Sequence, residues 1–452
     1  MERVREQLEG AIQVTLLGLV LVITFASSHI QPWNVPDFRV MRTFVLLELA
    51  ALSLAYLVVT RARLRRLPGG LLVAAFSAFA LLSAAWSPQP GLTFSRALGF
   101  AVLIAAAAAL ALGVAGRPRA AGQLLLALLA AAVIVTLAGL VELWHSPDQA
   151  ILPATKGQGA RYNGVGQNPN QIAMLLALTL PLVAWAVRQA TGRVRIAVWV
   201  AVLLVVGSLV ASGSRGAAIG AFLGCLAYLL AVARGRRLAV IAGMALVFVG
   251  AIGAMQLPQP AHENPALYET FGRTPKLSPY DLNSELPLES ELGFPGENVE
   301  TGDTRTLFTS SGRVQAWELA VRQGLERPIA GYGFGTEDVT FVDRSYLFVS
   351  RLVENSFIGT FLQLGALGVL LMVAAVAVPL TAWWRALPRL DRETAELASA
   401  AAGVVVAGIV VAASQSYITF VGSPPTAPFW IALFLLAGFV AHARRSEARS
   451  SP

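Results

Sequence analysis

The sequence predicts an all-α polytopic membrane protein with about twelve transmembrane helices and one large loop outside the membrane. Of the 452 residues, 56% are hydrophobic and 13% are charged, whereas soluble domains carry about 25% charged residues. The apolar residues form blocks of about 20, the length that crosses a hydrocarbon core about 30 Å thick. This composition excludes an ordinary cytosolic enzyme and a disordered protein.

Twelve apolar blocks are the expected spans, in chain order: 11–30, 42–60, 69–86, 96–115, 121–144, 170–187, 195–212, 215–233, 238–256, 354–382, 394–415 and 426–443. The first block follows two arginines, as a signal peptide does, but its length and the eleven blocks behind it favour an uncleaved membrane anchor. The single cysteine, Cys225, lies inside an apolar block, so no disulfide is expected within the chain.

Positive charge is distributed unequally between the two sides of the membrane. The two ends of the chain and alternate short loops hold 20 of the 34 Lys and Arg residues, and the opposite short loops and span ends hold six. Because Lys and Arg in short loops favour the cytoplasmic side, both termini are expected in the cytoplasm. The excess charge predicts contact with anionic membrane lipids rather than with nucleic acid.

A loop over residues 257–353 divides the chain into three parts. Residues 1–256 hold the first nine expected helices, and residues 354–452 hold the last three and a cytoplasmic tail. The loop carries 14 acids against 8 bases. Its first half is rich in Pro, Gly, Ser and acidic residues and is expected to meander.

The second half of the loop is expected to contain an amphipathic helix near the membrane surface. Its apolar residues recur at steps of three or four, which is the helical period; they are Val314, Trp317, Val321 and Leu325. This helix should end before the glycine-rich turn at Gly331, Gly333 and Gly335.

Two arginines opposite the termini are candidates for holding an anion. Arg215 lies in the segment SGSRGA, which joins two expected spans through almost no loop. An arginine at a span start is costly unless it faces protein or ligand, and the free amides there favour an anion; the alternative is an arginine that snorkels and anchors a span end. Arg313 begins the expected loop helix, and its alternative is an ordinary solvent-exposed arginine.

Two polar segments on the same side add further candidates. Arg161, Asn168 and Asn170 lie in a segment of glycines and amides that suits sugar hydroxyls or phosphate oxygens, or else forms a turn and a helix N-cap. Glu354 and Asn355 open the tenth span. A carboxylate there is expected to lose part of its hydration and to act as a base near neutral pH; the alternative is an acid that stabilises the helix dipole.

Gly365 and Gly368 in the tenth span predict close helix packing. The four histidines share no metal-ligand spacing, and the sequence lacks a P-loop, a D-x-D pair and an HExxH motif. A reaction without metal or cofactor is therefore expected.

The order of these motifs resembles the O-antigen ligase and O-antigen polymerase superfamily. Four features occur in sequence: a multi-span start, SGSRGA opening a span, a large loop with S-G-R-x3-W and P-x-x-G-Y-G-x-G, and a span that begins E-N-S. The resemblance implies a fold similar to the C-type membrane glycosyltransferases. It also implies a bacterial inner membrane protein whose active site faces the periplasm.

The resemblance implies transfer of a glycan from an undecaprenyl pyrophosphate carrier to an acceptor hydroxyl, with inversion and without a metal. The acceptor is another lipid-linked glycan or a lipid A core. Arg215 and Arg313 match the two arginines expected to bind the pyrophosphate. Tyr332, in the glycine-rich motif, and Asn355 are expected to contact the substrate, together with Arg161, Asn168 and Asn170.

One position departs from the ligases. They usually carry a histidine, their expected base, eleven residues before the first glycine of G-x-x-G, and here that position is Glu354. A carboxylate can also deprotonate a hydroxyl, so polymerase and ligase both stay open. The alternative function is a transporter of lipid-linked sugar or polysaccharide, which should show internal repeats and ion-binding groups at mid-membrane; the halves show no repeat.

Overall fold

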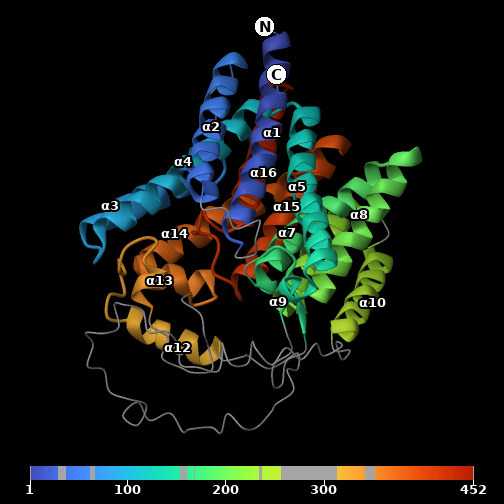
Figure 1. Ribbon diagram of the computed structural model, residues 1–452. Coiled ribbons are helices and arrows are strands. Elements are labelled where there is room, and N and C mark those ends of the chain that lie inside the picture. The colour runs from blue at the N-terminus through green and yellow to red at the C-terminus, as the bar shows by residue number, and fades with distance from the viewer. Residues whose placement is uncertain are drawn as a thin grey trace.

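The computed structural model describes residues 2–28, 37–61, 67–152, 160–166, 168–233, 237–255, 313–341 and 352–450. In this part the chain is almost entirely helical (Figure 1). Its twelve main helices are α1 (Glu2–Ala26), α2 (Asp37–Val59), α3 (Gly70–Leu82), α4 (Pro90–Val114), α5 (Pro118–His145), α7 (Pro169–Gln189), α8 (Gly192–Ala211), α9 (Arg215–Val232), α10 (Arg237–Met255), α14 (Ser356–Ala386), α15 (Arg392–Ala412) and α16 (Thr426–Ser450).

Each of these helices overlaps one of the twelve expected spans, in the same order. In the described part of the chain, ten helices are long and apolar enough to cross a membrane, and two further apolar helices, Gly70–Ala85 and Leu238–Ala251, are shorter. A 13-residue helix such as α3 is about 20 Å long, which is less than the hydrocarbon thickness. The all-α polytopic membrane fold is therefore confirmed, with ten clear spans where about twelve were expected.

The remaining elements are short. They are α6 (Pro147–Ala150), the antiparallel two-residue strands β1 (Ile151–Leu152) and β2 (Arg161–Tyr162), α12 (Arg313–Gly324), α13 (Glu337–Thr340) and two 3-10 turns (Ser83–Ala85 and Leu387–Arg389). Of these elements, β2, α12 and α13 are considered below because they touch the candidate site or support residues that do.

The centre of the bundle is formed by α7, α15 and α16, whose residues are mostly buried, whereas most of α8 and α2 is exposed. Helices α9 and α15 approach each other closely at two glycines. A Cβ atom on Gly224 would lie 2.5 Å from the carbonyl oxygen of Gly403. Small residues at such crossings allow membrane helices to pack backbone to backbone.

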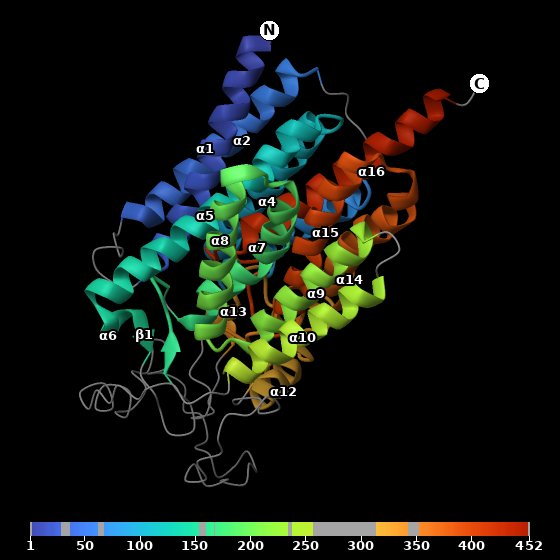
Figure 2. The same cartoon turned by 90° about the vertical axis from the view of Figure 1, so that its right-hand side faces the viewer.

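The molecule has two distinct ends. The beginning of α1 and the end of α16 lie at one end, and α12 and α13 lie at the other, in both views (Figures 1 and 2). The candidate residues Arg215, Arg313 and Glu354 begin or precede helices whose starts lie at the α12 end. The candidate residues therefore lie at the same end of the helix bundle.

Helix α12 lies where the loop helix was expected, and it packs on α14 through two alanines. Ala316 and Ala320 are fully buried in this contact, whereas Val314 is 54% and Leu325 is 60% exposed. The place of this helix at the membrane surface stays a prediction. The two alanines let α12 approach α14 closely, and the larger apolar side chains stay outside that contact.

Candidate functional site

The turn between α8 and α9 presents Arg215 at the first position of a helix. Helix α8 ends at Ala211 and α9 begins at Arg215, with Ser214 as the N-cap residue and Gly213 at φ 60°. Glycine reaches this left-handed conformation without steric cost. Arg215 therefore sits beside the free amides of a helix start, where an anion is stabilised.

The second arginine, Arg313, lies close enough to Arg215 for the two charges to interact. Their mutual repulsion favours an anion between or beside them. The turn in SGSRGA and the start of α12 are thus brought together, although they lie about 100 residues apart in the chain.

Arg313 forms an ion pair with Glu354. The Nε and Nη2 atoms of Arg313 donate hydrogen bonds of 2.8 and 2.5 Å to the same carboxylate oxygen, Oε2. The two side chains are 17% and 18% exposed, so the pair is mostly shielded from water. Within the described part of the chain, Oε1 accepts no hydrogen bond.

Glu354 has a strained backbone. Its φ is +52°, in the left-handed region, which only one other non-glycine residue of the described chain adopts. A non-glycine residue there costs about 1–3 kcal/mol and persists only where the surroundings hold it. Such strain concentrates at functional sites, and the contacts that hold Glu354 identify its supporting residues.

The R-x3-W spacing in α12 is explained by contacts with Val353 and Glu354, which precede α14. Arg313 binds the side chain of Glu354, and Trp317, one turn later, donates from its indole Nε1 to the carbonyl oxygen of Val353 at 3.0 Å. Residues four apart lie on one face of a helix. One face of α12 therefore grips two consecutive residues before α14.

Glu337 is a buried carboxylate that the sequence analysis did not single out. It begins α13 and accepts hydrogen bonds from Val353 N at 2.8 Å, Ser416 Oγ at 2.6 Å and Gln363 Nε2 at 3.0 Å. Burial raises its pKa to about 7, because loss of water disfavours the charge more than these bonds favour it. Only its place directly after the glycine-rich motif could have drawn attention to it.

The glycine-rich motif fills a break in α14. Gly365 interrupts the helix with φ 62° and ψ −165°. Tyr332 N and Gly333 N donate to the carbonyl oxygens of Leu362 and Gln363 before the break, at 3.0 and 2.7 Å. After it, Ala366 N donates to Pro328 O at 2.7 Å. The motif thus bonds backbone groups that the break leaves free.

The prediction that Gly365 allows close packing with another helix was wrong, because Gly365 faces the backbone of a loop. A Cβ atom on Gly365 would lie 2.3 Å from the backbone carbon of Ile329, in the loop, and one on Gly368 would meet Leu364 of the same helix. Gly365 is needed for its left-handed backbone and for the close approach of the motif.

The motif is also anchored in the core. Phe334 is fully buried, with its ring centroid 5.4 Å from that of Phe100 in α4 and 6.3 Å from that of Phe76 in α3. Arg96 at the start of α4 forms a two-bond ion pair with Asp338 of α13, at 2.5 and 2.9 Å. These contacts hold the start of α13 against the bundle.

Tyr332 turns its hydroxyl toward the end of α12. The hydroxyl donates to Gln323 O at 3.3 Å and also contacts Glu326, and Arg327 lies over its ring at 4.7 Å from the centroid. Contact of Tyr332 with the substrate stays a prediction.

Arg161 supports the turn that carries Arg215. Arg161 is only 8% exposed, and it donates from Nε to Ser212 O and from Nη2 to Asn170 Oδ1, both at 2.7 Å. Asn170 is buried with it. Two predicted substrate-binding residues thus brace the SGSRGA turn, and their direct contact with a substrate stays a prediction.

The other two asparagines cap helices. Asn168 accepts a hydrogen bond from Gln171 N at the start of α7, and its side chain is exposed. Asn355 is buried, accepts from Phe357 N and Ile358 N at the start of α14, and donates to Ala413 O. Both therefore act as N-cap residues, which was the alternative for Asn168, and binding of substrate by either stays a prediction.

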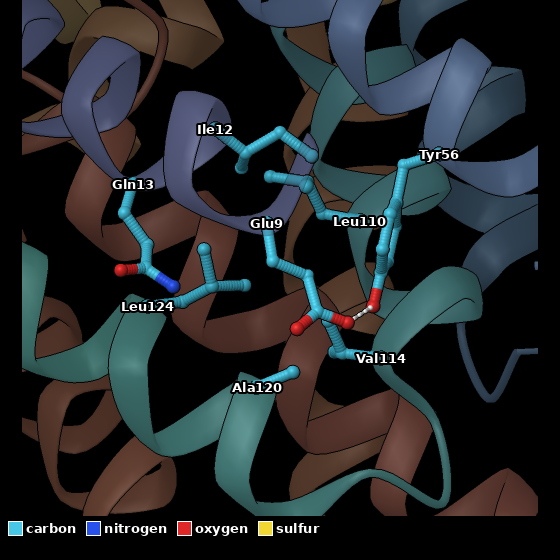
Figure 3. A pocket seen from close by; sticks show the side chains of 8 residues that line it. All are labelled: Glu9, Ile12, Gln13, Tyr56, Leu110, Val114, Ala120 and Leu124. Atoms are coloured by element: carbon cyan, nitrogen blue, oxygen red, sulfur yellow. Dashed lines mark hydrogen bonds between the residues drawn. The ribbon is translucent and has the colours of Figure 1, made fainter. Parts of the chain in front are cut away.

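A small pocket lies at the other end of the molecule, between α1, α2, α4 and α5 (Figure 3). Glu9 and Tyr56 point toward each other there, and the Tyr56 hydroxyl donates to Glu9 at 2.5 Å. Because this pocket lies toward the chain ends, it is separate from the candidate site. Among the described residues, no three His, Cys, Asp or Glu side chains gather as a metal site; independence from metal stays a prediction.

A family model described as O-antigen ligase matches residues 199–373. The resemblance to the O-antigen ligase superfamily is confirmed. The matched stretch runs from α8 into α14 and contains Arg215, Arg313, Glu337 and Glu354. No curated protein matches the sequence. The match supports a membrane enzyme of polysaccharide assembly, of the ligase and polymerase type.

Proposed function

We propose that this protein transfers a glycan from an undecaprenyl pyrophosphate carrier to an acceptor hydroxyl at the periplasmic face of the bacterial inner membrane. The observation that carries the proposal is the convergence of Arg215, Arg313 and Glu354 at one end of the bundle, inside the family match. Two arginines beside a helix start suit a pyrophosphate, and a carboxylate beside them suits proton removal.

The leaving group needs charge stabilisation and the acceptor needs a base. The acceptor oxygen forms a new bond to the anomeric carbon as the bond from that carbon to the pyrophosphate breaks, and the configuration inverts. The acceptor proton goes to Glu354. Undecaprenyl pyrophosphate is the leaving group, and Arg215 and Arg313 stabilise its negative charge. Bonds from fixed guanidinium groups strengthen as charge develops in a site poor in water.

The ion pair adds a step of donor recognition. The pair with Glu354 uses Nε and one hydrogen of Nη2, so Arg313 can bind a phosphate through its remaining Nη hydrogens while it keeps the pair. The pyrophosphate then competes with the carboxylate for the positive charge of Arg313, which weakens the ion pair. Donor binding is therefore expected to make Glu354 a better proton acceptor.

A transporter is not favoured. Arg215 and Arg313 stand at helix starts, with Glu354 two residues before α14, rather than at mid-membrane. The break in α14 is filled by backbone bonds to the loop motif, whereas a carrier's broken helix coordinates its cargo.

The test uses purified protein in lipid vesicles with undecaprenyl-linked repeat units as the only glycan. Lengthening of the glycan chains without added acceptor identifies a polymerase, and transfer only after addition of lipid A core identifies a ligase. Absence of any transfer under both conditions, with movement of the lipid-linked glycan across the vesicle membrane, contradicts the proposal and supports a transporter.

A further inference from the structure

One carboxylate binds the peptide groups on both sides of Glu354. Val353 N donates directly to Glu337 Oε1 at 2.8 Å. Asn355 N donates to Ser416 Oγ at 3.1 Å, and Ser416 Oγ donates to the same Glu337 Oε1 at 2.6 Å. Glu354, with its left-handed backbone, lies between the two bound amides.

The neighbours of Glu337 are arranged for its ionised form. Ser416 Oγ accepts from the Asn355 amide and donates its own hydrogen to Glu337. Gln363 Oε1 accepts a bond from Gly335 N at 2.7 Å, which turns the Gln363 amino group toward Glu337 Oε2. All three groups that bond the carboxylate are therefore donors, and a carboxylate is acceptor-only when ionised.

Glycine creates the space for this carboxylate. A Cβ atom on Gly359 would lie 2.5 Å from Glu337 Oε2 and 2.8 Å from its carboxyl carbon, closer than such contacts occur. Gly359 lies in the first turns of α14, three residues after its start. The absence of a side chain at Gly359 therefore lets the Glu337 carboxylate pack against the backbone of α14.

The charge is expensive to keep. Glu337 is buried, and no cationic side chain of the described residues bonds it. The charged side chains next to it in sequence and at the segment it supports already have partners: Asp338 is bound to Arg96 of α4, and Glu354 is bound to Arg313 of α12. Its pKa of about 7 reflects this cost. A buried charge retained at such a cost is typical of a functional role.

We propose that Glu337 is a positioning residue that holds Glu354 in the left-handed conformation in which it meets Arg313 and the acceptor. The catalytic part of this inference rests on the proposed function, whereas the positioning of the ion pair does not. Glu337 acts through the backbone of Val353 and Asn355 and touches neither donor nor acceptor.

The test compares E337Q with the exchange variant E337Q/Q363E. In E337Q the new amino group faces the amino group of Gln363, so at least one bond of the network is lost. In the exchange variant the carboxylate moved to position 363 accepts bonds from Gly335 N and from the amide introduced at position 337, so every bond can form again. E318Q is the control, because it removes a carboxylate that pairs with the exposed Arg322 and leaves α13, Val353 and Asn355 untouched.

The first measurement is independent of catalysis. Tm values in detergent are measured for R313A, E354A and the double variant, in each background. In the wild-type and E318Q backgrounds the two losses in Tm should be non-additive, because Arg313 and Glu354 are paired. They should become additive with E337Q and non-additive again in the exchange variant. Additivity that is the same in all backgrounds overturns the inference.

The second measurement is transfer. E337Q should lower kcat about 10²-fold, the order expected when a reacting group is displaced by about 1 Å, with KM for the donor changed much less, and the exchange variant should recover most of the rate. If E337Q fails to fold, the exchange variant still decides: a folded exchange variant without paired Arg313 and Glu354 contradicts the inference. A wild-type protein without transfer activity contradicts the proposed function only.

Discussion

Glu354→Gln tests two roles of Glu354: its ion pair with Arg313, which should affect stability, and its action as a base, which should affect the rate of transfer. The substitution keeps the shape of the side chain but removes its charge and its ability to take a proton. Breaking a fully buried ion pair costs about 3–5 kcal/mol, and an exposed pair contributes about 0–1 kcal/mol. With 17% and 18% exposure, we expect a loss of about 1–3 kcal/mol in the free energy of unfolding.

The kinetic effect should be larger and should divide between rate and binding. Loss of a general base costs about 10²–10⁴ in rate. Donor affinity should rise, because the negative charge of the carboxylate no longer repels the pyrophosphate or offsets the charge of Arg313. A gain of about 1.4 kcal/mol would tighten the donor Kd about tenfold.

The assay is single-turnover transfer at saturating donor, with donor binding measured separately by equilibrium titration. Glu318→Gln is the matched control, because Glu318 lies on the same helix as Arg313 and pairs with the exposed Arg322. A rate for Glu354→Gln within about threefold of wild type, far short of the loss of a base, would remove Glu354 from the mechanism. Glu354→His should recover part of the rate, since histidine can take the proton and tolerates the left-handed conformation better than most residues.

Three further predictions concern the arginine, the metal and the pH dependence. Arg215→Lys should abolish most transfer although the charge is kept, because lysine cannot form the two-bonded fork to a phosphate; wild-type turnover in this variant would favour the anchoring role. Transfer should persist in EDTA, and inhibition that magnesium or manganese reverses would contradict this. Glu337 has a folded pKa of about 7, above its unfolded value, so the folded protein binds more protons between about pH 4.5 and 7. Its contribution to the free energy of unfolding should therefore fall by about 3 kcal/mol across that window. The rate of transfer should rise over the same range, because the ionised Glu337 carboxylate accepts the bonds that position Glu354. Tm and rate measured from pH 5 to 8 check both trends, and E337Q should flatten the Tm trend.

The membrane helices were predictable because each is specified locally. A block of about 20 apolar residues is sufficient evidence for a spanning helix, since the backbone must satisfy its own hydrogen bonds in lipid. This accounts for the agreement of all twelve helices with the expected blocks. The same local signal does not set a helix's length: the apolar blocks around α3 and α10 form helices shorter than the ten candidate spans.

The site was predictable only where a residue signals its role by its neighbours in the chain. Arg215 is conspicuous among small residues at a span start, and Glu354 at the mouth of a span. The pair of Arg313 with Glu354 joins residues 41 apart. The hydrogen bond from Ser416 to Glu337 joins the α15–α16 connection to α13. Such contacts depend on how distant segments pack, and no local pattern encodes them. An acidic residue next to a glycine-rich turn is indistinguishable in sequence from an ordinary solvated one.

The contacts that hold residue 354 in place are made almost entirely to backbone atoms. Glu337 binds Val353 N, Ser416 binds Asn355 N, and Trp317 binds Val353 O. None of these bonds depends on the side chain at position 354. The scaffold can therefore present a glutamate or a histidine at this point of the site, provided that the residue tolerates a left-handed backbone. We infer that the departure of this sequence from the histidine usual in the ligases changes the base and leaves its support intact, which is why Glu354→His is the substitution most expected to remain active.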